Sequence, residues 1–232
     1  MIYMSLFYEE DNKMTCKKSF VRMASLLVLV ALLVAAIPTQ AFAAETETFE
    51  MPHYNQFDYD DVLYGSQRGG RKTVADRGCG ITSLSMVATY LYQDESLTPD
   101  YLATVYGNPD KPVDNVDYGS LATIMVSVGE NHLGLNMDLT YNFYDAVEAL
   151  EEGKVVISLQ NPGCFTAVPN GHFVVFRGIT EDGKILVNDP NGYTYARYPD
   201  YFAYGFPQCK LWDTGSGYWI VTVADATNSN IS

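Results

Sequence analysis

The chain has 232 residues, of which 47% are apolar and 13% aromatic, and its 14 Lys and Arg against 28 Asp and Glu give a formal net charge of −14. The apolar content is enough for one substantial core or two small lobes and is too high for a disordered chain. The shortage of basic side chains argues against nucleic acid and against an anionic membrane surface as partners, because both require clustered Lys and Arg.

The N-terminal residues have the order of a secretory leader. A basic patch within residues 17–22 precedes an uncharged, mostly apolar run at 23–37, and small residues follow at 41–43. This order predicts a signal peptide over residues 1–43 and a protein that is secreted or held at the cell surface. An uncleaved N-terminal anchor is the alternative, although the run is short for a membrane span. Acidic residues precede Met14, so Met14 is a second candidate start.

After the leader, the sequence predicts a polar spacer at residues 44–50, one folded domain at 51–225 and a polar tail at 226–232 without a membrane anchor. From Gly80 to Gly153 the domain has apolar residues at spacings of three and four, which indicate the buried faces of helices. Four helices are expected in this stretch, at about 81–91, 98–105, 117–129 and 142–153.

The second part of the domain has the pattern of strands. Four short runs are rich in β-branched and aromatic residues and are bounded by turn-forming residues, at 155–159, 173–179, 184–188 and 218–223. Helices first and strands second predict the α+β class, with a helical lobe packed against an antiparallel sheet lobe. A cleft between two such lobes is the expected place for a functional site.

Removal of the leader leaves three cysteines, Cys79, Cys164 and Cys209. Outside the cytoplasm an odd count allows at most one internal disulfide and leaves at least one free thiol. Cys164 and Cys209 can pair, which leaves Cys79 free, or both can be buried thiols. The sequence leaves these two alternatives open.

Cys79 has the surroundings of a reactive thiol. It lies between Gly78 and Gly80, directly ahead of the first predicted helix. The positive end of a helix dipole and its free N–H groups stabilise a thiolate, and the same N–H groups can receive an oxyanion. A small buried hydrophobic residue, or one half of a disulfide, is the competing interpretation.

His172 is a candidate base for this thiol. It opens the apolar run 173–176, which we expect to be buried on both faces of a sheet. An imidazole at the first residue of a buried strand is held rigidly, and it can keep a thiol on the other side of the cleft ionised. A histidine that ends a strand without a catalytic role is the alternative.

Asp189 is a candidate partner for the imidazole. A carboxylate that accepts the ring N–H fixes the orientation and tautomer of a histidine. A tight hairpin turn pairs Asp189 with Phe176, on the same face as His172, so direct contact requires a turn centred nearer Thr180 or a bulge. An Asx-type turn ahead of Pro190 is the competing interpretation.

Gln56 is a candidate oxyanion donor. It lies in the run Tyr54-Asn55-Gln56-Phe57, ahead of Cys79 in the chain. Side-chain amides serve this purpose in acyl transfer, where they stabilise the charge that develops on the carbonyl oxygen. An ordinary polar residue is the alternative interpretation.

Over about residues 51–223 the chain resembles the C39-like branch of the papain-like cysteine peptidases. The elements that carry the resemblance are, in order, Gln56, Cys79-Gly80-Ile81-Thr82-Ser83-Leu84-Ser85-Met86, Gly171-His172-Phe173-Val174-Val175 and Asp189-Pro190. The resemblance implies a papain-like fold with Cys79 as nucleophile and His172 as general base. It also implies Asp189 as the orienting carboxylate and Gln56 as part of the oxyanion hole.

The function expected from these residues is that of a secreted cysteine peptidase or amidase acting on a peptide or protein substrate, with no cofactor and no metal. The best-known relatives are domains of membrane transporters, but this sequence resembles neither an ATPase nor a membrane domain, so their substrate is not carried over. Two other functions remain open: a non-catalytic extracellular binding module on the same shell, and a transglutaminase-like acyl transfer.

Two further features carry weaker signals. The acidic run at 58–61 can bind Ca²⁺ but lacks the spacing of an EF-hand, and a solvated loop is the simpler interpretation. The aromatic-rich stretch at 193–204 suits a recognition rim or sugar stacking, whereas packing within a loop is the commoner use of such residues.

Overall fold

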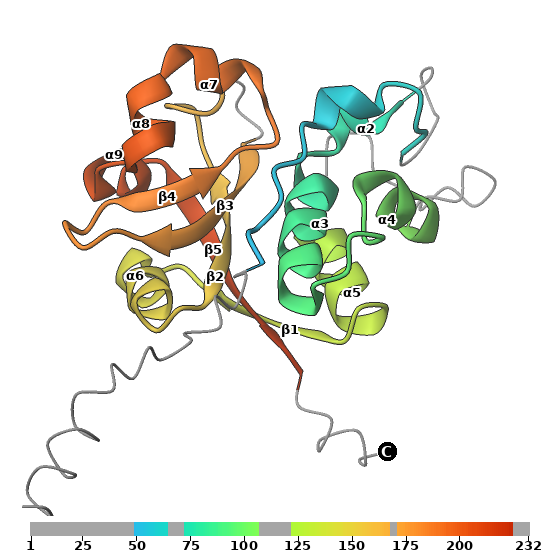
Figure 1. Ribbon diagram of the computed structural model, residues 1–232, viewed down its shortest axis with the longest axis horizontal. Coiled ribbons are helices and arrows are strands. Elements are labelled where there is room, and N and C mark those ends of the chain that lie inside the picture. Colours follow the sequence, from blue (N-terminus) through green and yellow to red (C-terminus); the bar gives the residue numbers. More distant parts are fainter. Residues whose placement is uncertain (1–48, 65–71, 107–121, 168–170, 225–232) are drawn as a thin grey trace, which may run out of the picture. The chain divides into compact units, whose positions relative to one another are not determined.

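The structure, a computed structural model, describes residues 49–64, 72–106, 122–167 and 171–224 (Figure 1). The predicted leader, most of the spacer, the C-terminal tail and the first residues of the helix expected at 117–129 lie outside these ranges. Within them, no helix combines the length and the apolar character that crossing a membrane requires.

An antiparallel sheet of five strands forms the centre of the described domain. The strands are β1 (Leu135–Thr140), β2 (Val155–Gln160), β3 (His172–Ile179), β4 (Ile185–Asn188) and β5 (Gly215–Val223). They lie in the order β1-β5-β2-β3-β4, so the last of these strands in the chain lies between the first two. Neighbours on both sides, together with helices on both faces, bury the apolar runs of β2 and β3.

Helices cover both faces of the sheet. They are η1 (Gln56–Tyr59), α2 (Val74–Arg77), α3 (Cys79–Tyr92), α4 (Pro99–Tyr106), α5 (Ala122–Asn131), α6 (Phe143–Glu151), α7 (Tyr193–Arg197), α8 (Pro199–Tyr204) and α9 (Gln208–Trp212). Figure 1 shows α2 to α5 on one side of the sheet and α6 to α9 on the other. This arrangement confirms the α+β class and the helical lobe packed against an antiparallel sheet lobe.

Each face of the sheet has its own core, because side chains alternate along a strand. Ile157 of β2 points to the cluster that contains Leu84 of α3, whereas the neighbouring Val156 points to the cluster that contains Ala146 of α6. Each fully buried aliphatic side chain contributes about 1.5–3 kcal/mol to folding relative to an exposed one. The first cluster therefore holds α3 against one face of the sheet, and the second holds α6 against the other.

The four predicted helices are confirmed as α3, α4, α5 and α6 within the described residues. α3 begins at Cys79, two residues earlier than expected, so the cysteine belongs to the first helical turn. The N-cap of α6 is Asn142, whose side-chain oxygen accepts the N–H of Tyr144 at 3.1 Å. The same helix ends ahead of Gly153, which has a positive φ of 79° as expected for a glycine after a helix.

One strand contradicts the expectation of a purely helical first half. β1 lies between α5 and α6, and its residues Leu135 and Met137 are buried whereas Asn136 and Asp138 are exposed. This alternation is the period of a half-covered strand. β1 pairs with β5, where Leu135 lies opposite Val223, so the strand depends on a partner far away in the sequence.

The aromatic-rich stretch at 193–204 forms the short helices α7 and α8. Tyr195 stacks on Phe202 with ring centroids 3.8 Å apart, and Tyr198 stacks on Tyr201 at 5.9 Å. Rings of this stretch also pack on aromatic residues outside it, such as Phe206. Tyr193 and Tyr204 are exposed. Packing therefore accounts for most of this stretch.

Candidate active site

Cys79 is the first residue of α3, and its neighbour Gly78 is the N-cap of that helix. A Cβ at Gly78 would lie 2.5 Å from both the side chain and the carbonyl oxygen of Val74 in α2. Glycine is needed here because α2 and α3 meet too closely for a side chain. The close junction places a partly buried thiol at the positive end of a 14-residue helix.

His172 is the first residue of β3 and lies opposite Gln160 of β2. Its imidazole is buried, with 8% of the residue exposed. Gly171 precedes it with a φ of 76°, a left-handed conformation that favours glycine. The backbone ahead of β3 therefore determines where the ring enters the site.

We expect Gly171→Ala to destabilise the protein by about 1–2 kcal/mol, the cost of a side chain in the left-handed conformation, and to reduce hydrolysis by displacing His172. The new Cβ would also lie 2.9 Å from the Cδ1 of Leu159. Urea denaturation and peptide turnover measure the two effects. Gly153→Ala is the matched control, because it has a φ of 79° and open space around its Cβ. An equal loss of activity in both variants would contradict this prediction.

Asp189 contacts His172 directly: the Nε2 of the imidazole lies 2.6 Å from the Oδ1 of the carboxylate. The register that a tight turn predicts, with Asp189 opposite Phe176, is wrong. Asn188 instead pairs with Val175, which places Asp189 opposite Val174. Val174 is two positions along β3 from His172. The face expected from the alternation of side chains is confirmed.

Two irregularities of the β3–β4 hairpin cause this change of register. The N–H of Thr180 donates to the carbonyl of Lys184, so the loop contains three residues instead of two. A bulge between Phe176 and Gly178 shifts the pairing by one further residue. Each irregularity moves Asp189 one position toward His172, and the bulge is one of the two devices that contact was expected to require.

The carboxylate of Asp189 is fully buried and has three hydrogen-bond donors. Oδ1 accepts the N–H of Asn191 at 2.7 Å as well as the imidazole of His172. Oδ2 accepts the hydroxyl of Thr194 at 2.5 Å. The Asx-type turn, which we considered as an alternative to the contact with His172, therefore exists together with that contact.

These contacts favour a thiolate–imidazolium pair. Burial raises the pKa of the Cys79 thiol, but the hydrogen bond and charge of His172, together with the N–H groups of Phe173 and Gly80, bring that pKa below the ordinary value. Burial lowers the pKa of His172, but the hydrogen bonds and charges of Asp189 and Cys79 raise it to about 10. Because Nε2 faces Asp189, Nδ1 is the ring nitrogen that remains for the sulfur.

The two pKa shifts predict a broad pH range for hydrolysis. Activity should rise below the usual pH of thiol ionisation, as Cys79 loses its proton, and should fall as the pH approaches 10, where His172 loses the proton that a leaving group needs. The pH dependence of kcat/KM measures both limbs. Iodoacetamide labelling across the same pH range should show Cys79 reacting at lower pH than an ordinary thiol, with the labelling of the exposed Cys209 measured alongside. A single limb near the ordinary thiol pKa would contradict the ion pair.

Gln56 is buried at the start of η1. Its Nε2 donates to the carbonyl of Ala75 in α2 at 2.8 Å, and its backbone N–H donates to the carbonyl of Pro190 at 2.9 Å. Among the described contacts, these join Gln56 to the helix before Cys79 and to the turn after Asp189. The second N–H of the amide is the donor that Gln56 has left for an oxyanion.

Cys164 and Cys209 are both free thiols in the described structure. Cys164 is partly buried, and burial raises its pKa against an opposing effect of Lys210. The alternative in which these two cysteines pair is therefore not found, and the alternative of two buried thiols is wrong for Cys209, which is exposed at the start of α9. Of the three described cysteines, Cys79 is the one that has both an imidazole partner and a lowered pKa.

Sequence reasoning did not assign roles to several residues that hold the site together. The imidazole of His53 lies 2.7 Å from the backbone oxygen of Asp189, and the backbone N–H of Asp189 donates to the hydroxyl of Tyr195 at 3.3 Å. Asn55 accepts the N–H of Gly192 through its side chain. The contacts of His53 and Asn55 join segments more than 130 residues apart, and the sequence carries no local signal for them.

The acidic run at 58–61 lies at the end of η1. Asp58 and Asp60 are exposed, and the carboxylate of Asp58 is 3.4 Å from the side-chain amide of Asn55. Throughout the ranges that the structure describes, no group of three or more His, Cys, Asp or Glu is placed to hold a metal ion.

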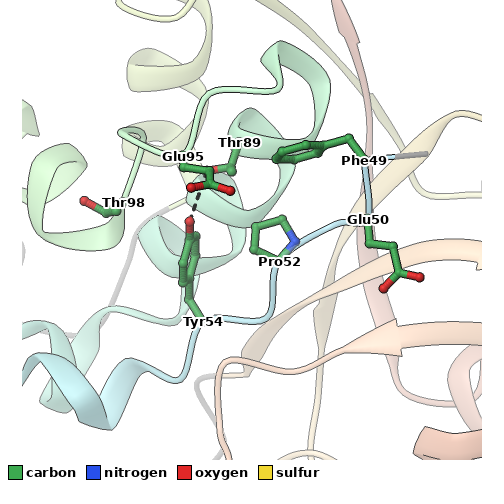
Figure 2. Close-up of a pocket in the computed structure, with 7 residues that line it drawn as sticks. All are labelled: Phe49, Glu50, Pro52, Tyr54, Thr89, Glu95 and Thr98. Atoms are coloured by element: carbon green, nitrogen blue, oxygen red, sulfur yellow. Dashed lines mark hydrogen bonds between the residues drawn. The ribbon is translucent and has the colours of Figure 1, made fainter. Parts of the chain in front are cut away.

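A pocket of about 530 Å³ lies away from the proposed catalytic residues. It is lined by Phe49, Glu50, Pro52, Tyr54, Thr89, Glu95 and Thr98 (Figure 2). Figure 2 shows Tyr54 reaching up toward Thr89, and their hydroxyls are 3.5 Å apart. Thr89 is ten residues along α3 from Cys79, or about 15 Å of helix axis. The pocket is therefore separate from the site at the start of this helix.

The chain is similar to one protein family and to a solved structure. The sequence profile of the Peptidase_C39 like family matches residues 48–213. No curated protein is similar enough to the chain to count as a match. Among solved structures, the chain is similar to a crystal structure from Bacillus anthracis that is provisionally described as a C39-like peptidase. The similarity has 16% identity and a TM-score of 0.43, and it covers 71% of this chain and 96% of that one.

The matched family region contains all four candidate residues and spans well over half of the chain. It includes α3 with its N-terminal cysteine and the hairpin that carries His172 and Asp189. The chain therefore belongs to the Peptidase_C39 like family and has the α+β, papain-like fold of a helical lobe packed on an antiparallel sheet.

Proposed function

We propose that the protein is a secreted cysteine peptidase or amidase that hydrolyses a peptide or amide bond through Cys79, His172 and Asp189. The observation that carries this proposal is the chain of contacts from the thiol at the start of α3, through the buried imidazole, to a fully buried carboxylate 2.6 Å away. Membership of a peptidase family supports the same reaction class. The site residues need neither a metal nor a cofactor for this chemistry.

In the proposed reaction, the Cys79 thiolate attacks the carbonyl carbon of the scissile bond. The carbon–nitrogen bond then breaks, the leaving amine takes the proton of the His172 imidazolium, and a thioester remains on Cys79. A water molecule next gives a proton to His172 and attacks the thioester, which releases the acid and restores the thiolate. Each half-reaction passes through an oxyanion, and in this proposal the N–H groups at the start of α3 and the amide of Gln56 stabilise it.

Asp189 does not take the proton in this scheme. It accepts the Nε2–H of His172, so that Nδ1 points to the sulfur and the positive ring is stabilised. Complete burial of the carboxylate strengthens this interaction, because water does not screen it. The carboxylate therefore sets both the tautomer and the orientation of the base.

The decisive experiment compares wild-type protein and Cys79→Ala against a peptide library, with and without an added amine. Cleavage that depends on Cys79 and that yields free acids supports the peptidase. Amine-linked products would instead indicate acyl transfer of the transglutaminase type. No cleavage, combined with labelling of Cys79 that has the pH dependence of an ordinary thiol, would indicate a non-catalytic binding module with a papain-like fold.

Gln56→Ala should lower kcat by about 10²–10³-fold, the usual loss when one oxyanion donor is removed. The matched control is Gln208→Ala, because the Nε2 of Gln208 also donates to a backbone carbonyl, that of Gly183 at 2.9 Å, far from the thiol. Steady-state kinetics on a cleaved peptide measure both variants. Equal kcat values in Gln56→Ala and Gln208→Ala would remove Gln56 from the oxyanion hole.

Export of the protein is supported by the basic, apolar and small-residue order of residues 1–43. We expect the mature protein to be found outside the cell with Ala44 at its N-terminus. N-terminal sequencing of protein recovered from the medium or the cell surface tests this. Retention of the apolar run would instead indicate an anchored form.

A further inference from the structure

We propose that Thr194 is a positioning residue for the catalytic apparatus: its hydroxyl orients the carboxylate of Asp189 toward His172. This inference rests on the proposed function and extends it to a residue of α7 that neither the sequence motifs nor the family match assigns a role.

The two oxygens of Asp189 have different partners. Oδ1 accepts from His172 at 2.6 Å and from the N–H of Asn191 at 2.7 Å. Oδ2 accepts the Thr194 hydroxyl at 2.5 Å. Among the contacts of the described residues, this hydroxyl is the donor to Oδ2. Asp189 is fully buried and Thr194 is 4% exposed. Removal of the hydroxyl would therefore leave a charged oxygen without a donor, in a place that water does not reach.

The chain holds the Thr194 hydroxyl in place from its own backbone. The backbone N–H of Thr194 donates to the carbonyl of Asn191 at 3.1 Å. The hydroxyl has one proton, which goes to the closer, charged Oδ2 of Asp189 at 2.5 Å and not to the same carbonyl, 2.8 Å away. Tyr193, the first residue of α7, donates its N–H to the side chain of Asn191 at 3.2 Å. The turn after Asp189 thus leads directly into a helix whose second residue returns to the carboxylate.

Other residues hold the backbone of Asp189. The His53 imidazole contacts its carbonyl oxygen at 2.7 Å, and the Tyr195 hydroxyl accepts its N–H at 3.3 Å. These contacts do not involve the carboxylate. Loss of the Thr194 hydroxyl should therefore change the orientation of the carboxylate more than the position of Asp189 in the fold.

A carboxylate without this donor either rotates away from His172 or takes up a proton. Both changes weaken the stabilisation of the imidazolium, so the alkaline limb of activity should move to lower pH. The titratable groups around the carboxylate are His172, Cys79 of α3, His53 of the N-terminal segment and Tyr195 of α7, and the charge of Arg177 in β3 acts on Tyr195. Burial raises the pKa of Tyr195 to about 12, so this phenol stays protonated over the range tested.

The test uses the full mature chain with Thr194→Val, which keeps the shape and removes the hydroxyl, and Thr194→Ser, which keeps the hydroxyl. We expect Thr194→Val to lower kcat by about 10- to 100-fold with little change in KM, as misplaced catalytic groups do, and to move the alkaline limb downward. Thr194→Ser should restore both. The matched control is Thr89→Val, because Thr89 is also fully buried and donates to a backbone carbonyl, that of Leu97, but lies far along α3.

The outcomes separate this inference from the proposed function. Iodoacetamide labelling of Cys79 against pH needs no substrate, so an ordinary thiol profile in the wild-type protein would overturn the proposed function itself. An ion-pair profile that Thr194→Val leaves unchanged, with wild-type kcat, would overturn the role of Thr194 alone. An equal loss in Thr89→Val would show that general destabilisation is the cause. Should Thr194→Val not fold, as seen by circular dichroism, Thr194→Ala provides the same comparison without the added methyl group.

Discussion

Replacement of Cys79 by alanine is expected to abolish peptide hydrolysis, with a loss on the order of 10⁶-fold in kcat, as occurs when the nucleophile of a triad is removed. No other described thiol can substitute for it. Burial raises the pKa of Cys164, so that thiol stays protonated at neutral pH, and Cys209 lies exposed on α9. Binding of a substrate that the variant no longer cleaves should persist, because the rest of the site is retained.

The fold of Cys79→Ala should remain intact. Alanine is a strong helix former, and the helix start is maintained by Gly78 and by the core contacts of α3. Circular dichroism and urea denaturation check this, and peptide turnover checks the activity. The matched control is Cys164→Ala, which removes another partly buried thiol and should keep full activity. Wild-type turnover by Cys79→Ala would end the assignment of the nucleophile.

Replacement of His172 by alanine should have an effect of similar size for a different reason. The imidazolium is the main influence that lowers the pKa of Cys79 against its burial. Without it, the burial of the thiol raises that pKa, so labelling by iodoacetamide at neutral pH should fall together with hydrolysis. His132→Ala is the control, because His132 is exposed after α5. Unchanged labelling of Cys79 at pH 7 would show that His172 does not ionise the thiol.

The same variant also tests the buried pair. His172→Ala leaves the fully buried carboxylate of Asp189 without its imidazole, and breaking a buried ion pair in this way costs about 3–5 kcal/mol of stability. The double variant His172→Ala/Asp189→Asn removes the unpaired charge. It should regain part of the free energy of unfolding without regaining activity. A double variant that is no more stable than the single one would mean that Asp189 is protonated or solvated in the absence of His172.

Local sequence signals predicted where the candidate site residues lie in the fold. A cysteine between glycines at a helix start predicts an activated thiol, and Cys79 does occupy the first turn of α3. A histidine ahead of an apolar run predicts a buried imidazole at a strand end, as found for His172. The alternation of side chains placed Asp189 on the face of His172, because parity depends on the residue count alone.

These local signals do not predict contacts between segments that are distant in the sequence. β1 exists because Leu135 and its neighbours pair with β5, nearly 90 residues later in the chain. Thr194 approaches Asp189 because the turn after that residue leads at once into α7, whose Tyr195 stacks on Phe202 of α8. The short apolar and polar patterns of these segments are compatible with loops as well as with the structures that they form.

By itself, the sequence determined the class of the protein, the order of the helices α3 to α6 and of the strands β2 to β5, and the side chains expected to face the site, because hydrophobic periodicity and turn residues act locally. The tertiary structure decided whether those side chains meet. A three-residue loop and a bulge in β3 move Asp189 by two positions, from a place opposite Phe176 to within 2.6 Å of His172. Periodicity specifies the face of a strand but not its register, which depends on the packing of the whole sheet.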